Sequence, residues 1–123
     1  MKDPEVLDRA ECLRLLATAR YGRVVYTVRG LPAVQPVRFV VRDDAVSFLA
    51  AEHSDLLATA DGGVVAFEAD EWDDEKCWWV TVLGRAAVVP APAGLPSLHV
   101  PAAGIRVPAE VVTGRRAEGR DPA

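Results

Sequence analysis

Three runs rich in β-branched and aromatic residues follow one another through very short connections. The runs span residues 23–28, 33–41 and 45–50, and the segments 29–32 and 42–44 that join them have the composition of turns. Strands joined this tightly pair antiparallel, because a parallel neighbour requires a crossover of a dozen or more residues. The sequence therefore predicts an antiparallel meander. Pro36 predicts a bend or an opening in the second strand, because proline cannot donate a hydrogen bond to a neighbouring strand.

Two short stretches carry the signals of helices. Apolar residues recur at helical spacing between residues 8 and 19, and Asp8 followed by Glu11 is typical of a capping box. The stretch 54–60 begins at Ser54, a favoured N-cap, and ends before a pair of glycines. Two helices are too few to cover both faces of a parallel sheet, so the chain is predicted to be mainly β.

Further strands are expected at residues 64–69, 77–89 and 104–107. The long run 77–89 contains Gly84, which predicts a bulge or a sharp coil that lets one strand serve two sides of a barrel. Barrel closure also removes the exposed strand edges of so small a β protein. We therefore predict a six-stranded antiparallel split β-barrel with two short helices over residues 1–114, followed by a flexible polar tail over residues 115–123.

The charge balance argues against one class of function. The 123 residues carry 14 basic and 18 acidic side chains, a net charge of −4, which is not the positive field of a protein that binds nucleic acid through its phosphates. No stretch approaches the roughly 18 apolar residues that span a bilayer, and residues 1–5 lack the apolar run of a secretory signal. We expect a cytoplasmic protein that binds neither nucleic acid nor membrane, with Cys12 and Cys77 as reduced thiols.

The usual motifs of catalysis and metal binding are missing from the sequence. His53 and His99 have no cysteine or carboxylate at ligand spacing, so no metal site is expected. The sequence also lacks a Gly-x-Ser-x-Gly elbow, a Walker loop and a Gly-x-Gly-x-x-Gly turn, and no catalytic residue is assigned. The acidic run 70–75 offers oxygen ligands for a divalent cation, but it lacks the spacing of a calcium loop and is typical of a solvated hairpin tip.

Two features are candidates for binding. Trp78 and Trp79 are neighbours on a predicted strand, so one faces the core and the other faces solvent, a partner subunit or a ligand. Arg38 interrupts an apolar strand, where a guanidinium needs an anion. Its partner is either a carboxylate such as Glu68 or an anionic group of a ligand, for example a phosphate or a flavin oxygen, and the sequence leaves both open.

Six segments, taken in order, carry a resemblance to a known family. They are Glu11-Cys12-Leu13 with Leu15-Leu16, Gly22-Arg23-Val24, Pro32-x-Val34-x-Pro36-Val37-x-Phe39, Val65-Ala66-Phe67-Glu68-Ala69-Asp70, Trp78-x-Val80-x-Val82-x-Gly84-Arg85-Ala86 and Val112-Thr113-Gly114-Arg115-Arg116. Each segment alone is a weak signal. Their order over nearly the whole chain resembles the pyridoxamine 5'-phosphate oxidase-like family.

The resemblance implies a split β-barrel that forms a homodimer, with a flavin, usually FMN, in each of two clefts at the subunit interface. It places Val37, Arg38 and Phe39 along the isoalloxazine ring, whose polar edge would be contacted partly by backbone groups. It also implies that Trp78 or its neighbour Trp79 lines the dimer surface. The function expected from the resemblance is an FMN-dependent oxidoreductase that acts on a small molecule, in which the cofactor carries the chemistry.

The chain departs from the family in the segment that holds the cofactor phosphate. The family's Thr-x-x-Gly-x-Lys-Leu corresponds here to Ala50, His53 and Asp55, followed by Leu56. Aspartate in place of lysine repels a phosphate, while a protonated His53 and the hydroxyl and amide of Ser54 compensate in part. The alternative function is therefore a homodimeric binding or structural protein that has lost FMN, or that binds another ligand such as a deazaflavin or haem.

Overall fold

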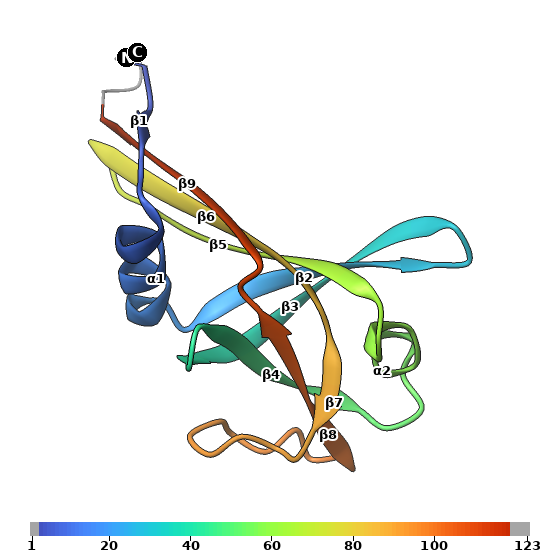
Figure 1. Cartoon of the computed structure of the whole chain (residues 1–123). Helices are drawn as coiled ribbons and strands as arrows, with labels where there is room; N and C mark the ends of the chain where they lie inside the picture. The colour runs from blue at the N-terminus through green and yellow to red at the C-terminus, as the bar shows by residue number, and fades with distance from the viewer. Residues whose placement is uncertain (1–2, 119–123) are drawn as a thin grey trace.

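The computed structural model describes residues 3–118, which contain nine strands and two helices (Figure 1). The strands are β1 (Glu5–Val6), β2 (Tyr21–Val28), β3 (Leu31–Arg42), β4 (Ala45–Ala51), β5 (Val64–Trp72), β6 (Lys76–Arg85), β7 (Ala87–Val89), β8 (Ala102–Pro108) and β9 (Val111–Glu118). The helices are α1 (Arg9–Thr18) and α2 (Asp55–Ala60). The strands pair antiparallel in the order β1-β9-β6-β5-β2-β3-β4-β8-β7. The predictions of a mainly β chain, an antiparallel meander and two short helices are confirmed.

Both helices begin at the predicted caps. The Asp8 carboxylate accepts the backbone N–H of Glu11 at 2.8 Å, and the Ser54 hydroxyl oxygen accepts that of Leu57 at 3.1 Å. Glu11 does not complete a capping box. Its carboxylate instead accepts hydrogen bonds from Arg14 in the same helix and from Arg116 of β9, the latter at 2.7 Å. Helix α1 is thus tied to the last strand of the described chain.

A continuous apolar core joins the sheet to both helices. Phe48 of β4, Phe67 of β5 and Leu16 of α1 are fully buried, and the ring of Phe39 meets that of Phe67 edge to face at 4.7 Å between centroids. The thiol of Cys12 lies where a Cβ on Gly114 of β9 would be, so a glycine at that position allows α1 to approach the sheet. No helix within residues 3–118 is long and apolar enough to span a bilayer.

Strand β3 changes its neighbour along its length. Residues 31–38 pair with β2, whereas residues 39–42 pair with β4. Beyond Phe48, β4 pairs with β8 only, so β3 and β4 separate between Arg38 and Leu49. The opening predicted from Pro36 lies at this point.

The strand count of nine differs from the predicted six because the long run 77–89 is divided and two more strands are present. The division falls at Ala86, two residues beyond Gly84. There the backbone of Ala86 donates to Gly63 and accepts from Gly62, each at 2.8 Å, at the end of α2. β1 is too short for any periodicity to reveal it.

The prediction of a flexible tail from residue 115 is wrong for residues 115–118. They belong to β9, which pairs with β6 from Leu83↔Val111 to Lys76↔Glu118. The sequence did not predict this strand because the charged pair Arg115-Arg116 is typical of a solvated tail. About half of the side chains of β9 lie at a surface, where charged residues are tolerated. Residues 119–123 of the predicted tail lie outside the described residues. β5 also runs through Trp72, so only residues 73–75 of the acidic run form the hairpin tip.

Candidate functional site

A pocket of about 280 Å³ opens where β3 separates from β4. Its walls come from β2, β3, β4 and the loop 90–101 between β7 and β8, the orange loop at the bottom of Figure 1. The lining residues are Tyr21, Gln35, Pro36, Val37, Arg38, Leu49, Leu95, Pro96, Ser97 and Leu98. Because most of these side chains are apolar and Tyr21, Gln35, Arg38 and Ser97 add polar groups, the pocket suits a flat apolar or aromatic group with a polar edge.

The side of β3 that faces this opening carries backbone groups that no strand within residues 3–118 pairs. The Phe39 N–H donates to the Arg20 carbonyl oxygen at 3.2 Å, and antiparallel alternation from this bond directs the backbone groups of residues 37 and 35 toward β2. The N–H groups of Arg38 and Val34 and the carbonyl of Pro36 therefore point away from β2, toward the opening. An N–H at position 36 would point toward the opening and not toward β2. The proline at this position therefore removes no hydrogen bond between β2 and β3.

Arg38 lies over the ring of Tyr21, with its Cζ 5.7 Å from the ring centroid. Its guanidinium makes no ion pair with any residue from 3 to 118. Glu68, the carboxylate that the sequence offered as a partner, is bound by Arg23 of β2, whose Nη1 lies 2.6 Å from Glu68 Oε2 and 3.4 Å from Asp70 Oδ2. Glu68 is therefore not the partner of Arg38, and an anionic group of a ligand stays a prediction.

The two carboxylates beside Arg23 shape the electrostatics next to the pocket. Partial burial and the neighbouring Asp70 raise the pKa of Glu68, and these effects outweigh the lowering effect of Arg23. The hydrogen bond from Arg23 to Glu68 in turn raises the pKa of Arg23. One guanidinium thus serves two carboxylates and has little charge left for a ligand, in contrast to Arg38.

The predicted contacts on β3 divide between two faces of the strand. The Val37 side chain is buried and lines the pocket, whereas that of Phe39 points into the core against Phe67. Arg38, between them, points to the opposite face, as the alternation of side chains on a strand requires. Val37 and Arg38 are the predicted site residues that line this pocket.

His53 and Ser54 lie in the turn that joins β4 to α2, outside the lining of the pocket. His53 is exposed and has a φ of 64°, an uncommon backbone conformation for a residue other than glycine. The Ser54 hydroxyl oxygen is occupied by the Leu57 N–H. Glu52 and Asp55 are exposed on either side of this pair, so the turn presents two carboxylates and no lysine or arginine.

The tryptophans face opposite sides of the sheet, as predicted from their adjacency. Trp78 belongs to the core and is only 8% exposed, whereas Trp79 lies on the outer face and stacks on Trp72 with ring centroids 6.4 Å apart. Trp78 is therefore buried within one subunit. Trp79 is the member of the pair that a partner subunit could reach.

Sequence reasoning missed several residues of the pocket. No motif marks Tyr21, Leu49 or the loop residues 95–98. The change of partners along β3 and the return of the chain from β7 to β8 bring them close to Arg38. The proline-rich composition of residues 90–96 signals a connector but says nothing about the pocket wall that it forms.

The chain matches a family model described as pyridoxamine 5'-phosphate oxidase over residues 8–116. It is also 44% identical over 93 residues to an uncharacterised protein of Mycobacterium tuberculosis, a match that covers 70% of this chain and 61% of that protein. The chain thus spans less than two thirds of the length of this relative.

Two solved structures extend the similarity to the fold. One is described as the FAD binding protein from Mycobacterium smegmatis, with 34% identity, a TM-score of 0.81, and coverage of 93% of this chain and 98% of the other. The other is described as a FAD-binding protein from Mesorhizobium loti. Its identity is 20%, its TM-score is 0.77 and the match covers 95% of this chain and all of the other, so that likeness concerns the fold alone.

Proposed function

Because this chain belongs to the pyridoxamine 5'-phosphate oxidase family, we propose that it binds a flavin at the opening between β3 and β4. The observation that carries this proposal is the convergence, at one pocket, of an unpaired backbone edge and a guanidinium without a carboxylate partner. Support also comes from the likeness to the FAD binding protein of Mycobacterium smegmatis.

The residues of the pocket fit the ring system of a flavin. Pro36, Leu49, Leu95 and Leu98 supply apolar surface for a planar ring. The pyrimidine edge of the ring carries one N–H donor and two carbonyl acceptors, which match the carbonyl of residue 36 and the N–H groups of residues 34 and 38. The volume of about 280 Å³ is at the lower end for a ligand pocket, so it would hold the ring rather than the whole cofactor.

A bound flavin would supply hydride or electron transfer, and on this basis we propose an oxidoreductase that acts on a small molecule. The chain's own contribution would be orientation and charge. Arg38 would stabilise negative charge at the polar edge of the ring, which favours the reduced form. The loop 90–101 would exclude water from one side of the pocket. None of the lining residues is a carboxylate or a histidine, so the pocket supplies no general base from its own side chains.

The phosphate-binding part of FMN fits less well than the ring. The turn between β4 and α2 offers Glu52 and Asp55, and the hydroxyl oxygen of Ser54 is already hydrogen-bonded. If the cofactor is FMN, we propose that this turn holds its phosphate only weakly. The contacts would come from His53 and from the hydrogen-bonding groups of the turn that are still free. The same observation favours the alternative, a homodimeric binding or structural protein that has lost FMN or that takes a deazaflavin or haem.

We propose that the sheet closes into a split barrel. β6 is the third strand of the order and β7 is the last, yet a single residue, Ala86, separates them along the chain. The strands from β6 to β7 in this order therefore start and finish at the same stretch of backbone, as they do in a closed barrel. The close approach of Gly84 to the carbonyl of Pro108 at the start of this stretch supports the closure.

We also propose that a second copy of the chain packs on the outer face of the sheet. The register places one row of apolar side chains across five strands of this face: Val111, Leu83, Ala66, Val25 and Val34. Val34 is 62% exposed, Val111 50% and Leu83 39%. Since Tyr21 and Arg38 lie on the same face, a homodimer formed here would complete the pocket.

The test is titration of the purified protein with riboflavin, FMN and FAD, followed by quenching of flavin fluorescence. We expect binding of at least one flavin with about micromolar affinity, and a loss of about tenfold or more in Arg38→Met. Arg9→Met, which removes an exposed arginine of α1, is the matched control and should bind like the wild type. The absence of binding of all three flavins at about 10 µM protein would overturn the proposal, and the same titration with a deazaflavin and haem would then test the alternative.

A further inference from the structure

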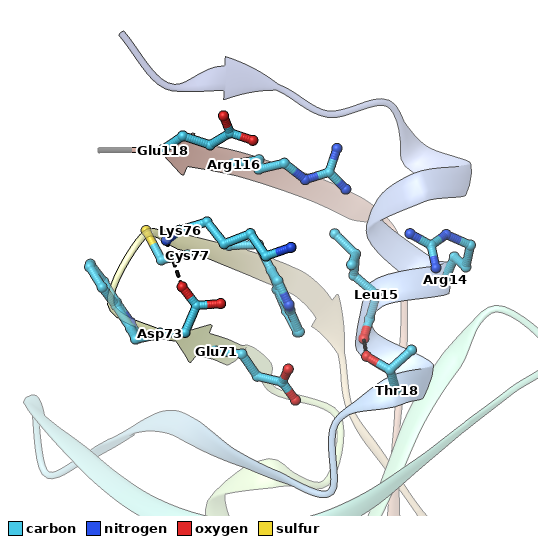
Figure 2. A pocket seen from close by; sticks show the side chains of 11 residues that line it. Arg14, Leu15, Thr18, Glu71, Asp73, Lys76, Cys77, Arg116 and Glu118 are labelled. Carbon is cyan, nitrogen blue, oxygen red and sulfur yellow. Dashed lines mark hydrogen bonds between the residues drawn. The ribbon is translucent and has the colours of Figure 1, made fainter. Parts of the chain in front are cut away.

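A second pocket of about 560 Å³ lies between helix α1, the end of the β5–β6 hairpin and β9 (Figure 2). Its walls are Arg14, Leu15 and Thr18 of α1, Glu71 to Asp73, Lys76 to Trp78, and Arg116 and Glu118 of β9. It shares no lining residue with the pocket proposed for the flavin, so a ligand held here would be separate from that function.

The register of the sheet arranges the floor of this pocket in two rows. In the first row, Glu71 of β5, Trp78 of β6 and Arg116 of β9 lie side by side. In the second, Lys76 lies opposite Glu118. Neighbouring strands are about 4.8 Å apart, so a carboxylate and a guanidinium start from the two sides of the indole. Figure 2 shows Glu71 along one edge of the pocket and Arg116 along the opposite edge.

Three charged groups of the pocket make no ion pair with any residue from 3 to 118. They are the carboxylates of Glu71 and Glu118 and the Lys76 ammonium, which attracts the nearby Asp73 carboxylate without forming an ion pair. Arg14 binds Glu11 of α1, and Arg116 binds both Glu11 and Glu5, so neither guanidinium has much charge left for a ligand. The pocket therefore presents unpaired charges of both signs, and a lone anion or a lone cation would satisfy only half of them.

The floor between these charges is apolar. Trp78 is 8% exposed and Leu15 is 7% exposed, and both contribute to the core. An aromatic side chain packed against Leu15 and the exposed edge of the indole would gain apolar contact area. The complementary ligand thus carries an ammonium, a carboxylate and an aromatic group.

We propose that this pocket binds a short zwitterionic peptide with an aromatic side chain, of which an aromatic dipeptide is the smallest case. Its ammonium lies against Glu71, its carboxylate against Lys76, and its ring against Leu15 and the exposed edge of Trp78. Glu71 lies opposite Trp78, and Lys76 lies two residues further along the same strand as Trp78, so the two charged residues start from backbones about 8 Å apart. The two charges of a free amino acid share one Cα, whereas those of a dipeptide are separated by a further step of about 3.8 Å, so the dipeptide spans the pocket better.

The test compares three peptides by calorimetry and by tryptophan fluorescence: glycyl-phenylalanine, its N-acetyl derivative and its C-terminal amide. The first carries both charges, the second lacks the ammonium and the third lacks the carboxylate. We expect the free dipeptide to bind in the range of about 0.1–1 mM, and each blocked form to bind about tenfold more weakly. No heat and no fluorescence change at about 10 mM dipeptide, or equal binding of all three, would overturn the proposal.

Two variants assign the binding to this pocket. Glu71→Gln should weaken the free dipeptide about tenfold and remove its advantage over the N-acetyl form, and Lys76→Gln should do the same with respect to the amide. Neither side chain is ion-paired within residues 3–118, so thermal unfolding of both variants should match the wild type. Glu52→Gln, at an exposed carboxylate of the β4–α2 turn, is the control. Unchanged binding in both Glu71→Gln and Lys76→Gln would place the peptide elsewhere and refute the assignment.

Discussion

The Nη1 atom of Arg23 lies 2.6 Å from Oε2 of Glu68, and the two residues stand directly opposite each other on β2 and β5. Arg38 lies on β3 opposite Tyr21, two residues along β2 from Arg23, and makes no ion pair among residues 3–118. The pairing of strands thus gives the acidic partner to one arginine and leaves the other at the mouth of a pocket. Arg23 thus forms an ion pair within the sheet, whereas Arg38 lines the pocket.

Replacement of these two arginines should separate stability from binding. Arg23→Met leaves Glu68 and Asp70 side by side without a cation, and because the pair is partly exposed we expect a loss of about 1 kcal/mol in the free energy of unfolding. Arg38→Met should change it by only about 0.5 kcal/mol, since it loses the contact with the Tyr21 ring but no ion pair. Urea denaturation of the two variants measures the difference. Equal losses would mean that Arg38, like Arg23, has a carboxylate partner.

Acid should weaken the tie between α1 and β9. The hydrogen bonds from Arg14 and Arg116 lower the pKa of Glu11 from 4.5 to about 2. Because the folded state has the lower pKa, the ionised carboxylate stabilises the fold fully above pH 4.5, and this contribution is lost as the pH falls toward 2. Glu11→Gln should therefore lower Tm at neutral pH, and the difference from the wild type should shrink through this range. A difference that stays constant from neutral to acidic pH would contradict the assignment.

Gly84→Ala should be strongly destabilising. A Cβ at this position would overlap the carbonyl oxygen of Pro108, which is backbone and cannot turn aside. We expect a loss of about 2 kcal/mol or more in the free energy of unfolding. Gly30→Ala is the comparison, because Gly30 has a φ of 80° but open space around it, and it should cost only the backbone strain of about 1 kcal/mol. Chemical denaturation measures the free energy of unfolding of both variants. A larger loss in Gly84→Ala than in Gly30→Ala supports steric overlap, and equal losses would contradict it.

Leu83→Asp should abolish the proposed homodimer. The substitution places a carboxylate in the middle of the apolar row on the outer face, where a second copy would bury it. Analytical ultracentrifugation should show a dimer for the wild type and a monomer for the variant. Leu31→Asp, at the exposed start of β3 and outside that row, should remain dimeric. A monomeric wild type would refute the proposal that a second copy of the chain packs on this face.

Asp55→Lys should tighten the binding of FMN but not that of riboflavin, which has no phosphate. Reversal of the charge at the start of α2 replaces repulsion by attraction, and we expect a gain of about tenfold or more in affinity. Asp55→Asn, which only removes the negative charge, should give part of this gain. An equal effect on both flavins, or none on FMN, would place the phosphate away from this turn.

Local sequence signals predicted much of the fold. The caps at Asp8 and Ser54, the turns predicted within 29–32 and 42–44 and the antiparallel meander all depend on residues close together in the chain. The strands β1 and β9 escaped prediction for two different reasons. β1 is too short to show a period, and the charged residues of β9 resemble a solvated tail until β6 is placed beside them.

The sequence alone predicted a bend or an opening near Pro36 and opposite faces for Trp78 and Trp79, and it raised the expectation of an anion at Arg38. The tertiary structure decided which side of β3 is open, which tryptophan is buried and which arginine receives Glu68. The physical reason is that the preferences of a residue are local, whereas its partner is set by the register between strands distant in the chain. A shift of one residue in the pairing of β2 with β5 would have put a different side chain opposite Glu68.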